Sequence, residues 1–372
     1  MIFIDEMPWM DTPRSKFVNA LEFFWNGWAS GRDDILLIVC GSATSWIINK
    51  IFKNHGGLHN RVTRQIYLEP FTLAECEEYA QSKNLALSRY DLLEAYMAVG
   101  GVPYYWSQME RGKSLAQNID ELFFSPSGKL HYEYNELYRS LFHNPDNYLS
   151  VIQSLARKKS GLTRDEIVCE SHIANNGNLT QVLDDLVHCS FIRSFNADTR
   201  KQYKKVYQLI DNFTLFHLHF MIDNKISDSE FWEHNYNSSI RLAWTGLAFE
   251  RVCFQHIPQI KKALGINGIS SNVYPWRIAA DDILGSGVQI DMLIDRADNT
   301  INLCEMKFAD REFYVDKDCD QNLRHKFHRL AEYTKHRKTL QITLITTYGI
   351  EQRGYWNVVQ NTITMEELFS KE

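Results

Sequence analysis

The sequence predicts a multidomain protein that combines α/β and α+β regions, and three observations support this fold class. With 372 residues, the chain is longer than one ordinary hydrophobic core requires. Near its start, short apolar runs alternate with helical stretches, which is typical of a parallel sheet covered by helices. From residue 239 onward, the order becomes helix, strand, hairpin, helix and strand. These changes divide the chain into four regions, at 1–70, 71–125, 126–238 and 239–372.

The composition describes a folded chain without membrane or disulfide signals. Hydrophobic residues make up 44% and charged residues 23%, as in globular domains. The net charge of −6 argues against a surface coated in basic charge, although a local basic groove is compatible with it. The seven cysteines form no Cys-x-x-Cys motif, which argues against a zinc site and favours a reducing compartment. No apolar run approaches the roughly 20 residues of a membrane span, and the start lacks the shape of a signal peptide, so we expect a soluble, cytoplasmic protein with no membrane partner.

The first region begins with a short apolar strand that ends in two acids. Ile2, Phe3 and Ile4 precede Asp5 and Glu6. This order fits a Walker B strand, in which Asp5 would bind Mg²⁺ and Glu6 would polarise the water that attacks a nucleotide phosphate. The alternative is an ordinary buried strand that happens to end in a surface acid, because such a strand matches the same pattern.

Two further residues extend this pattern. A second apolar run, at 35–40, predicts a buried parallel strand, and Ser42 after it is placed to sense a γ-phosphate. Arg61 lies before a third predicted strand, at 65–68, where ring ATPases often carry an arginine finger; a solvated arginine is the alternative. The P-loop motif G-x-x-x-x-G-K-[ST] does not occur in the sequence. We therefore expect no ATP hydrolysis by this chain as given, and ATP as a cofactor only in a protein that also contains that loop.

The second region, 71–125, predicts a small helical lid. Thr72, with Glu75 three positions later, forms a capping box, which marks the start of a helix. From there to about Phe124 the pattern is mostly helical, with a glycine- and proline-containing break at 100–103.

The third region, 126–238, predicts a winged helix. A helix up to Arg157, a short helix capped by Thr163 and a helix at 178–188 precede two strands, at 191–195 and 204–209. This is the order of elements in the winged helix, a variant of the helix-turn-helix.

The wing between those two strands is basic. Lys201, Lys204 and Lys205 lie at or beside its tip, and contact with the DNA backbone is the functional interpretation. A solvated charged surface is the alternative, and a winged helix can equally serve as a protein-docking module.

The last region, 239–372, contains the most specific chemistry, on a predicted hairpin. If its strands pair symmetrically around Asp298, Asp291 lies opposite Glu305. The alternation of side chains along a strand places Asp291 on the same face as Gln289 and Leu293. Opposed carboxylates on an otherwise apolar hairpin repel each other unless a cation lies between them. Oxygen ligands of this kind suit Mg²⁺, or Mn²⁺ in its place.

A lysine completes the hairpin pattern. Lys307, two residues after Glu305, is placed to orient and help deprotonate a water that attacks phosphorus. The alternative is a solvated hairpin in which Lys307 is a salt-bridge partner of the acids. Cys304 and Met306 flank Glu305 and favour partial burial of that acid.

Asp291 followed by Glu305-x-Lys307 on a hairpin resembles the PD-(D/E)XK nucleases, in particular their Holliday-junction-resolvase-like branch. Ile290 stands where that family usually has a proline. The resemblance implies a Mg²⁺-dependent endonuclease in which Asp291, Glu305 and Lys307 are catalytic and the two acids bind the metal ion. It also implies that Glu250, on the helix before the hairpin, is a further catalytic acid and metal ligand.

The same resemblance implies that the helix after the hairpin contacts nucleic-acid phosphates. The residues on that helix with suitable side chains are Arg324, Lys326 and Arg329.

Taken together, Asp5, Glu6, Ser42, Arg61 and the later regions resemble AAA+-like ATPases of an archaeal and bacterial family with a helical lid, a winged helix and a C-terminal domain of nuclease ancestry. The resemblance covers most of the chain. It implies a partial P-loop-NTPase-type sheet in the first region and a homo-oligomer formed through that ATPase part. The function it implies is metal-dependent processing of DNA. The alternative is a non-catalytic regulator that binds DNA or protein through a degenerate nuclease fold.

Overall fold

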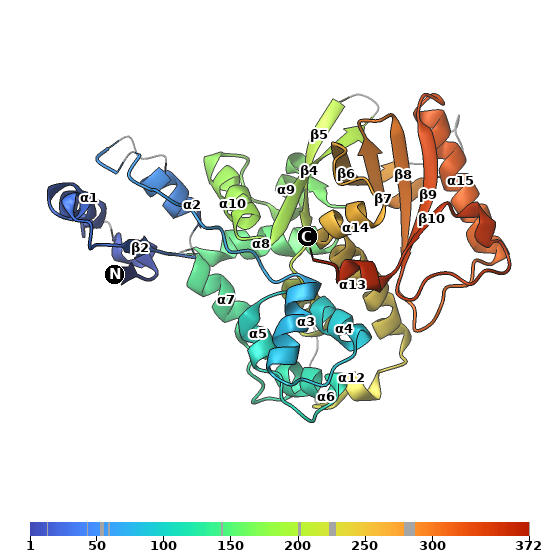
Figure 1. The fold of residues 1–372 in the computed structure, drawn as a ribbon, viewed down its shortest axis with the longest axis horizontal. Helices are drawn as coiled ribbons and strands as arrows, with labels where there is room; N and C mark the ends of the chain where they lie inside the picture. The colour runs from blue at the N-terminus through green and yellow to red at the C-terminus, as the bar shows by residue number, and fades with distance from the viewer. Residues whose placement is uncertain are drawn as a thin grey trace.

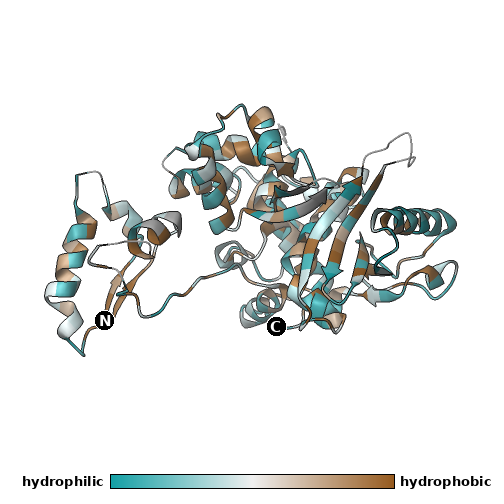
Figure 2. Ribbon diagram, turned by 90° about the horizontal axis from the view of Figure 1, so that it is seen from above, coloured by the Kyte–Doolittle hydropathy of each residue, from teal (hydrophilic) through white to brown (hydrophobic). Residues whose placement is uncertain are grey.

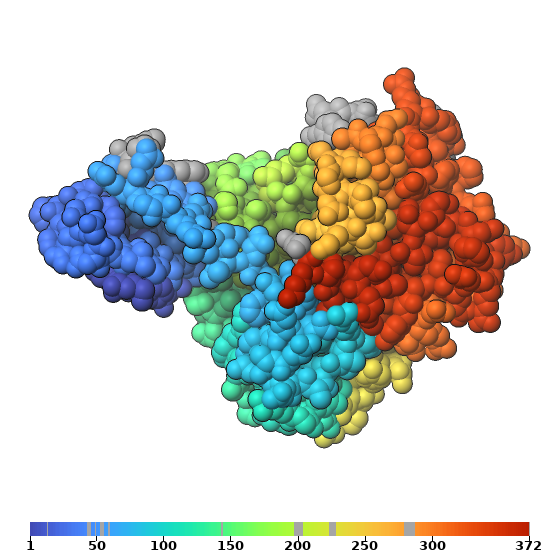
Figure 3. All heavy atoms as spheres, viewed as in Figure 1, coloured from blue at the N-terminus to red at the C-terminus, as the bar shows by residue number. Residues whose placement is uncertain are grey.

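The computed structural model describes residues 1–12, 14–42, 44–52, 56–58, 60–142, 144–199, 202–222, 228–278 and 287–371. Figure 1 shows a small N-terminal unit, residues 1–58, that extends from a larger body formed by residues 71–371 and contacts it between helices α2 (Thr44–Ile47) and α10 (Gly177–His188). In the space-filling view of Figure 3, the N-terminal unit is a separate lobe at the left of the molecule.

In the N-terminal unit, helices pack against a two-stranded parallel sheet. Its elements are β1 (Ile2–Ile4), α1 (Phe17–Gly27), β2 (Leu37–Val39) and α2 (Thr44–Ile47), followed by a π-helical turn (Ile48–Phe52). Phe3 of β1 pairs with Ile38 of β2. Met7 and Leu21 are buried in a core that belongs to this unit alone.

The third strand predicted at 65–68 is not formed. Residues 61–70 are extended and exposed, and no strand of the described chain pairs with them. Ile66 is 71% exposed and Leu68 87%, so this apolar run has no face to bury. A strand needs both a hydrogen-bonding partner and a packed face to be stable, and here it has neither.

The body begins with the helices predicted for the second region. These are α3 (Leu73–Ser82), α4 (Arg89–Val99), α5 (Pro103–Ser107) and α6 (Leu115–Ile119), followed by a π-helical turn (Asp120–Phe124). Thr72 and Glu75 form the predicted capping box at the start of α3. At the predicted break, a side chain on Gly101 would collide with the backbone of Phe71, whose N–H donates to the Gly101 carbonyl at 2.7 Å. Glycine is required there by this close approach.

The next part of the body places helices around a three-stranded antiparallel sheet of order β3-β5-β4. Its elements are α7 (Glu133–Leu141), α8 (Pro145–Ala156), β3 (Leu162–Thr163), α9 (Arg164–Ser171), α10 (Gly177–His188), β4 (Ile192–Thr199), β5 (Gln202–Leu209), α11 (Asn212–Phe220) and α12 (Phe231–His234). Thr163 caps α9 through a capping box with Glu166, as predicted. β4 and β5 extend beyond the predicted strand ends.

The last part of the body contains a five-stranded mixed sheet of order β10-β9-β8-β7-β6. Its elements are α13 (Ser239–Gln255), α14 (Ile257–Ala263), β6 (Ser271–Ile278), β7 (Val288–Arg296), β8 (Thr300–Lys307), α15 (Lys317–Tyr333), β9 (Thr339–Thr346), β10 (Asn361–Ile363) and α16 (Met365–Leu368). The strands from β6 to β8 are antiparallel, whereas β8, β9 and β10 are parallel. The helix α15 makes the crossover that a parallel β8–β9 pair requires.

Helices cover both faces of this sheet. On one face, Met292 and Met306 share a core with α13, and on the other, Leu293 and Leu303 share a core with Leu330 of α15. Figure 2 shows hydrophobic residues along the strands and mostly hydrophilic residues on α15 at the right of the view. The hairpin of β7 and β8 is therefore buried from both sides.

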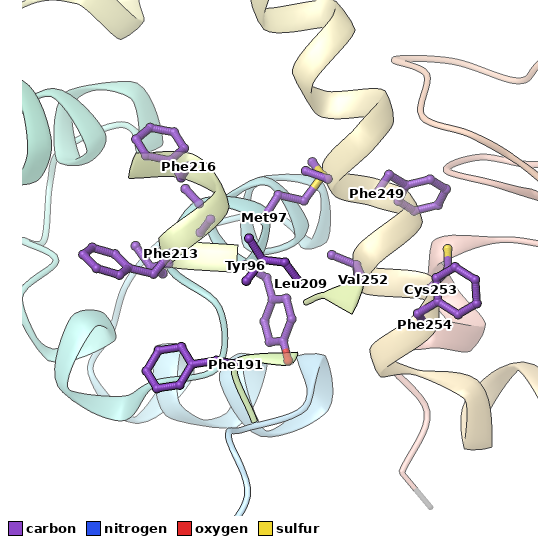
Figure 4. Close-up of a cluster of buried hydrophobic side chains, with 14 of the residues drawn as sticks. Tyr96, Met97, Phe191, Leu209, Phe213, Phe216, Phe249, Val252, Cys253 and Phe254 are labelled. Atoms are coloured by element: carbon purple, nitrogen blue, oxygen red, sulfur yellow. The ribbon is translucent and has the colours of Figure 1, made fainter. Parts of the chain in front are cut away.

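One hydrophobic core joins all parts of the body. In Figure 4, Tyr96 of α4, Phe213 and Phe216 of α11 and Phe249 of α13 surround a common interior. Phe216 also packs edge-on against Trp244 of α13, with ring centroids 5.2 Å apart. The parts of the body are thus held in a fixed relation. Among the helices that the structure describes, none is long and apolar enough to cross a membrane.

Candidate active site

The β7–β8 hairpin has the predicted register. Its residue pairs are symmetric around Asp298 and extend as far as Met292 and Cys304. Asp291 and Glu305 are the next residues beyond that last pair. The hairpin therefore places the two carboxylates at the same end of two neighbouring strands, as the symmetry argument predicts.

A β-bulge interrupts the pairing of β7 with β6 at Asp291. Tyr274 and Trp276 of β6 pair with Leu293 and Ile290 of β7. One residue, Pro275, separates the first two, whereas two residues, Asp291 and Met292, separate their partners. Proline has no N–H to donate to the ladder, so it is tolerated at such an irregularity. A bulge shifts the alternation of side chains. The predicted alternation is wrong here for that reason: Ile290 packs in the same core as Leu293, and Gln289 is exposed.

Three acids are buried together at this end of the sheet. Asp291 is 8% exposed, Glu305 is 5% exposed, and Glu250, which projects from α13, is 6% exposed. The Oδ2 atom of Asp291 accepts a hydrogen bond from the backbone N–H of Met306 at 3.2 Å. Because a buried carboxylate is costly without a counter-charge, the surrounding residues have to neutralise all three.

Lys159 neutralises two of the acids from outside the C-terminal sheet. It lies in the turn between α8 and β3, forms an ion pair with Glu250, and places its Nζ 3.6 Å from the Oδ1 atom of Asp291. Lys159 is not among the site residues that the sequence predicts. It precedes Glu250 by 91 residues, and no sequence pattern connects the two.

Two more lysines neutralise the third acid. The Nζ of Lys326, on α15, lies 2.5 Å from one carboxylate oxygen of Glu305, and the Nζ of Lys307 lies 3.1 Å from the other. We call the resulting group the acid–lysine cluster. Its members are Glu250, Asp291, Glu305, Lys159, Lys307 and Lys326.

Burial and like charges perturb the acids of this cluster. The pKa of Glu250 is raised to about 7, first by burial and second by the charge of Asp291, while the ion pair with Lys159 opposes the rise. Burial also raises the pKa of Asp291, and the charge of Glu305 adds to that effect. Burial by itself would lower the pKa of Lys307, but the charge and hydrogen bond of Glu305 outweigh it, so the pKa of Lys307 is raised.

The cluster has the ligand chemistry of a divalent-metal site, with ammonium groups where a metal would bind. Carboxylate oxygens are the ligands that Mg²⁺ and Mn²⁺ prefer. Within the described segments, no three His, Cys, Asp or Glu side chains are arranged around a common metal position. Lys159 contacts both Glu250 and Asp291, and so takes the position of a cation between them. Glu250 and Asp291 therefore offer carboxylate oxygens to a divalent cation once this lysine moves away.

The basic residues predicted on α15 have different surroundings. Lys326 is 8% exposed and its ammonium is engaged with Glu305. Arg324 is more exposed and pairs with Asp320 at 2.9 Å. Arg329 is buried, and its Nη1 lies 3.4 Å from Glu332. Of the three, Arg324 is the one whose side chain faces solvent.

The acids predicted for nucleotide chemistry lie together in the N-terminal unit. The backbone N–H and the hydroxyl of Ser42 donate to Glu6 Oε2 at 3.2 and 2.9 Å, and the thiol of Cys40 donates to Asp5 Oδ1 at 2.7 Å. These contacts bring together the carboxyl ends of β1 and β2. Arg61 is exposed in the extended segment, and no ion pair between described residues joins it to either acid.

The basic wing is described in part. Lys204 and Lys205 are exposed on β5, and the Nζ of Lys205 lies 5.2 Å from the ring centroid of Tyr207. Lys201 lies outside the described residues.

A cavity of about 420 Å³ lies away from the acid–lysine cluster, beside α7, α8 and α11. Its lining includes Tyr134, Asn135, Gln153 and His217, together with apolar side chains. His217 stacks on Tyr134 with ring centroids 4.2 Å apart, and burial lowers the pKa of His217 to about 4. The lining contains no acid or lysine, so the cavity does not share the chemistry of the cluster.

Comparisons with known proteins assign no family to the chain. No protein-family model matches it, and no curated protein matches it. Among solved structures, it is similar to a Walker-type ATPase of Pyrococcus abyssi, with 15% sequence identity and a TM-score of 0.38. The match covers 59% of this chain and 62% of that chain. Likeness at this level supports no assignment of fold or activity.

Proposed function

We propose that the body is a divalent-metal-dependent nuclease that acts on DNA, with the acid–lysine cluster as its active site. The observation that carries the proposal is the burial of Glu250, Asp291 and Glu305 at one end of the sheet. Burying three acids costs stability, and perturbed titratable groups of this kind are concentrated at functional sites. In the N-terminal unit, by contrast, the acids are arranged for a different chemistry.

Each member of the cluster has a distinct role in this proposal. Glu250, Asp291 and Glu305 would hold the metal ion through their carboxylate oxygens. The bound ion supplies a polarised water and offsets the negative charge of the phosphodiester. Lys307, whose side chain is 35% exposed, orients that water from the open side of the cluster. Lys326, whose side chain is 10% exposed, keeps Glu305 in place from the opposite side.

The elements from α8 to β5 support a DNA-binding role for the neighbouring part of the body. Their order of helix, strand, two helices and two antiparallel strands is that of a winged helix. We expect Lys204 and Lys205, with Lys201, to contact backbone phosphates. Replacing all three lysines with alanine should weaken DNA binding for all sequences alike and flatten its dependence on salt, because phosphate contacts release counterions. An unchanged salt slope in a binding titration would count against this role.

The N-terminal unit fits one half of a nucleotide site. Asp5, Glu6 and Ser42 lie at the carboxyl ends of two parallel strands, where α/β proteins bind their ligands. In this proposal, Asp5 would hold Mg²⁺ and Arg61 would serve a neighbouring copy in a homo-oligomer. Binding of ATP also requires a phosphate-binding loop.

A non-catalytic regulator is the second candidate, and one observation favours it. Lys159, Lys307 and Lys326 give each buried acid a counter-charge, so the cluster is neutral without a metal ion. A protein that uses this fold to bind DNA without cutting it would need no metal ion at the cluster.

Metal-dependent cleavage separates the two candidates. With millimolar Mn²⁺, the parent protein should cleave DNA and gain melting temperature, because a ligand that binds the folded state stabilises it. Asp291→Asn should lose the thermal gain and reduce cleavage by at least about 100-fold, since even residues outside the ligand shell can have effects of that size. Lys307→Ala should keep the thermal gain and lose cleavage.

Two acids outside the cluster provide controls for this experiment. Glu6→Gln and Asp310→Asn, an exposed acid beside Arg311, should cleave like the parent. If Mn²⁺ produces neither cleavage nor a change in melting temperature, the nuclease function is wrong and the regulator is favoured.

A further inference from the structure

We propose that Lys159 binds the substrate phosphate. Its ammonium stays paired with Glu250 and Asp291 until DNA and a divalent cation bind together. The inference rests on the nuclease function proposed above, and it adds a substrate contact from a part of the body that does not belong to the C-terminal sheet. Its consequence is that the phosphodiester and the cation bind cooperatively.

The backbone of Lys159 is fixed on two sides. Its carbonyl oxygen accepts one hydrogen bond from Gln208 Nε2 and another from Arg251 Nη2, both at 2.7 Å. Gln208 belongs to β5, and Arg251 follows Glu250 on α13. The turn is therefore clamped between the α8–β5 elements and the helix that carries one of the acids, so its position relative to the cluster is set by the fold.

The side chain of Lys159, in contrast, reaches solvent. It is 32% exposed, whereas the side chain of Lys326 in the same cluster is 10% exposed. Lysine has a flexible four-carbon stem, so its ammonium can turn outward while its backbone stays in place. Lys159 is thus able to leave the acids, and Lys326 is enclosed.

A divalent cation and the Lys159 ammonium compete for the same oxygens. The Nζ of Lys159 bonds to Glu250 and lies 3.6 Å from Asp291. A metal ion bound by both carboxylates would lie within a few ångströms of that ammonium, and two cations at such a distance repel each other. The ammonium then needs a new acceptor, and the oxygens of a phosphodiester accept from ammonium groups as carboxylates do.

The strand that carries Lys204 and Lys205 also contacts the turn of Lys159, because Gln208 of β5 donates to the Lys159 carbonyl. Phe195 of β4 and Val206 of β5 pack in the same core as Trp276 of β6, so the β4–β5 hairpin lies against the edge of the C-terminal sheet. Lys204 and Lys205 are exposed on that hairpin. A backbone that follows these lysines brings its phosphates toward Lys159, which supplies the acceptor that the displaced ammonium requires.

The experiment measures Mn²⁺ binding by calorimetry on the full chain, with and without a DNA duplex whose phosphorothioate linkages resist cleavage. The parent should bind Mn²⁺ about tenfold more tightly with DNA than without it, a coupling of ordinary size. Lys159→Met should bind Mn²⁺ tightly without DNA, and DNA should add little. Lys158→Met is the matched control, because it removes the neighbouring lysine, which pairs with Glu166, and should behave like the parent.

The outcomes distinguish this inference from the nuclease function on which it rests. If Mn²⁺ binds the parent equally well with and without DNA, or binds Lys159→Met no more tightly than the parent, Lys159 is not displaced and the inference is overturned while the metal site stands. If Mn²⁺ binds neither protein under either condition, both fall. The comparison of the parent with and without DNA needs no variant, so the test holds even where a substitution impairs folding.

Discussion

The two acidic sites of this protein are built in different ways. Asp5 and Glu6 are adjacent in the sequence, lie at exposed strand ends, and are held by the hydroxyl, thiol and amide groups of residues one strand away. Glu250, Asp291 and Glu305 come from three elements, are buried, and are held by lysines. Burial, and not the number of acids, therefore determines whether a site needs positively charged side chains from other parts of the chain.

The N-terminal unit and the segment after it also leave more large apolar side chains exposed than the body does. Twelve large apolar side chains are exposed within residues 1–68, against eleven in all the described residues that follow. In the N-terminal unit, Phe3 and Ile38 pair on the face of the sheet that its own core leaves exposed. The body covers both faces of its sheet, and that coverage is what buries its acids.

Removal of a buried lysine should destabilise the protein most, and a small loss of stability would contradict the role given to burial at the acid–lysine cluster. Lys326→Met leaves Glu305 with Lys307 as its remaining counter-charge, so the free energy of unfolding should fall by about 3 kcal/mol. Urea unfolding followed by tryptophan fluorescence measures this change. Combining the substitution with Glu305→Gln should recover most of the loss, because no unpaired charge is then buried.

An exposed ion pair is the control for that experiment. Arg311 pairs with Asp310, and their side chains are 77% and 71% exposed. Arg311→Met should cost much less stability than Lys326→Met, because exposed ion pairs contribute little. Equal losses for the buried and the exposed pair would contradict the role given to burial.

The dependence of stability on pH tests the charge cost of the buried acids. The pKa of Glu250 is raised to about 7 in the folded protein from its ordinary value of 4.5, so the folded state binds more protons than the unfolded chain between these values. Stability should therefore fall as pH rises from 4.5 to about 7, because the folded state releases the proton of Glu250 only near the upper end of this range. Asp291, whose pKa is also raised, acts in the same direction, while Lys159 opposes both.

Substitution of Glu250 measures how much this carboxyl contributes to the pH dependence of stability. Melting temperatures of Glu250→Gln between pH 5 and 7 should fall less with rising pH than those of the parent. Glu136→Gln, an exposed acid on α7 that pairs with Arg139, should keep the slope of the parent. If the melting temperature of Glu250→Gln falls with pH as steeply as that of the parent, ionisation of Glu250 does not destabilise the folded protein.

The smallest effect is expected in the N-terminal unit. Ser42→Ala removes the hydroxyl that donates to Glu6 and leaves the backbone N–H bond, so the unit should lose no more than about 1 kcal/mol. Because this unit has its own core, amide exchange should increase within residues 1–58 and remain unchanged in the body. Faster exchange in α4 or α13 would contradict the separation of the two units.

Features that depend on neighbouring residues can be predicted from the sequence. The register of the β7–β8 hairpin follows from its polar turn at Asp298 and the alternation of apolar residues on either side. The starts of α3 and α9 follow from capping boxes at Thr72 and Thr163, where side chain and backbone satisfy each other over three positions. These interactions are local, so the order of residues contains enough information to locate them.

Features that depend on residues far apart in the sequence follow only from tertiary packing. The bulge at Asp291 exists because Pro275 of the neighbouring strand lies opposite it, and the run at 65–68 is no strand because no edge lies beside it. Lys159 meets Glu250 and Asp291 because one continuous core holds the turn after α8 against α13 and the sheet. The sequence shows which residues can be charged. Tertiary packing determines which cationic side chain lies close enough to a buried acid to be its counter-charge.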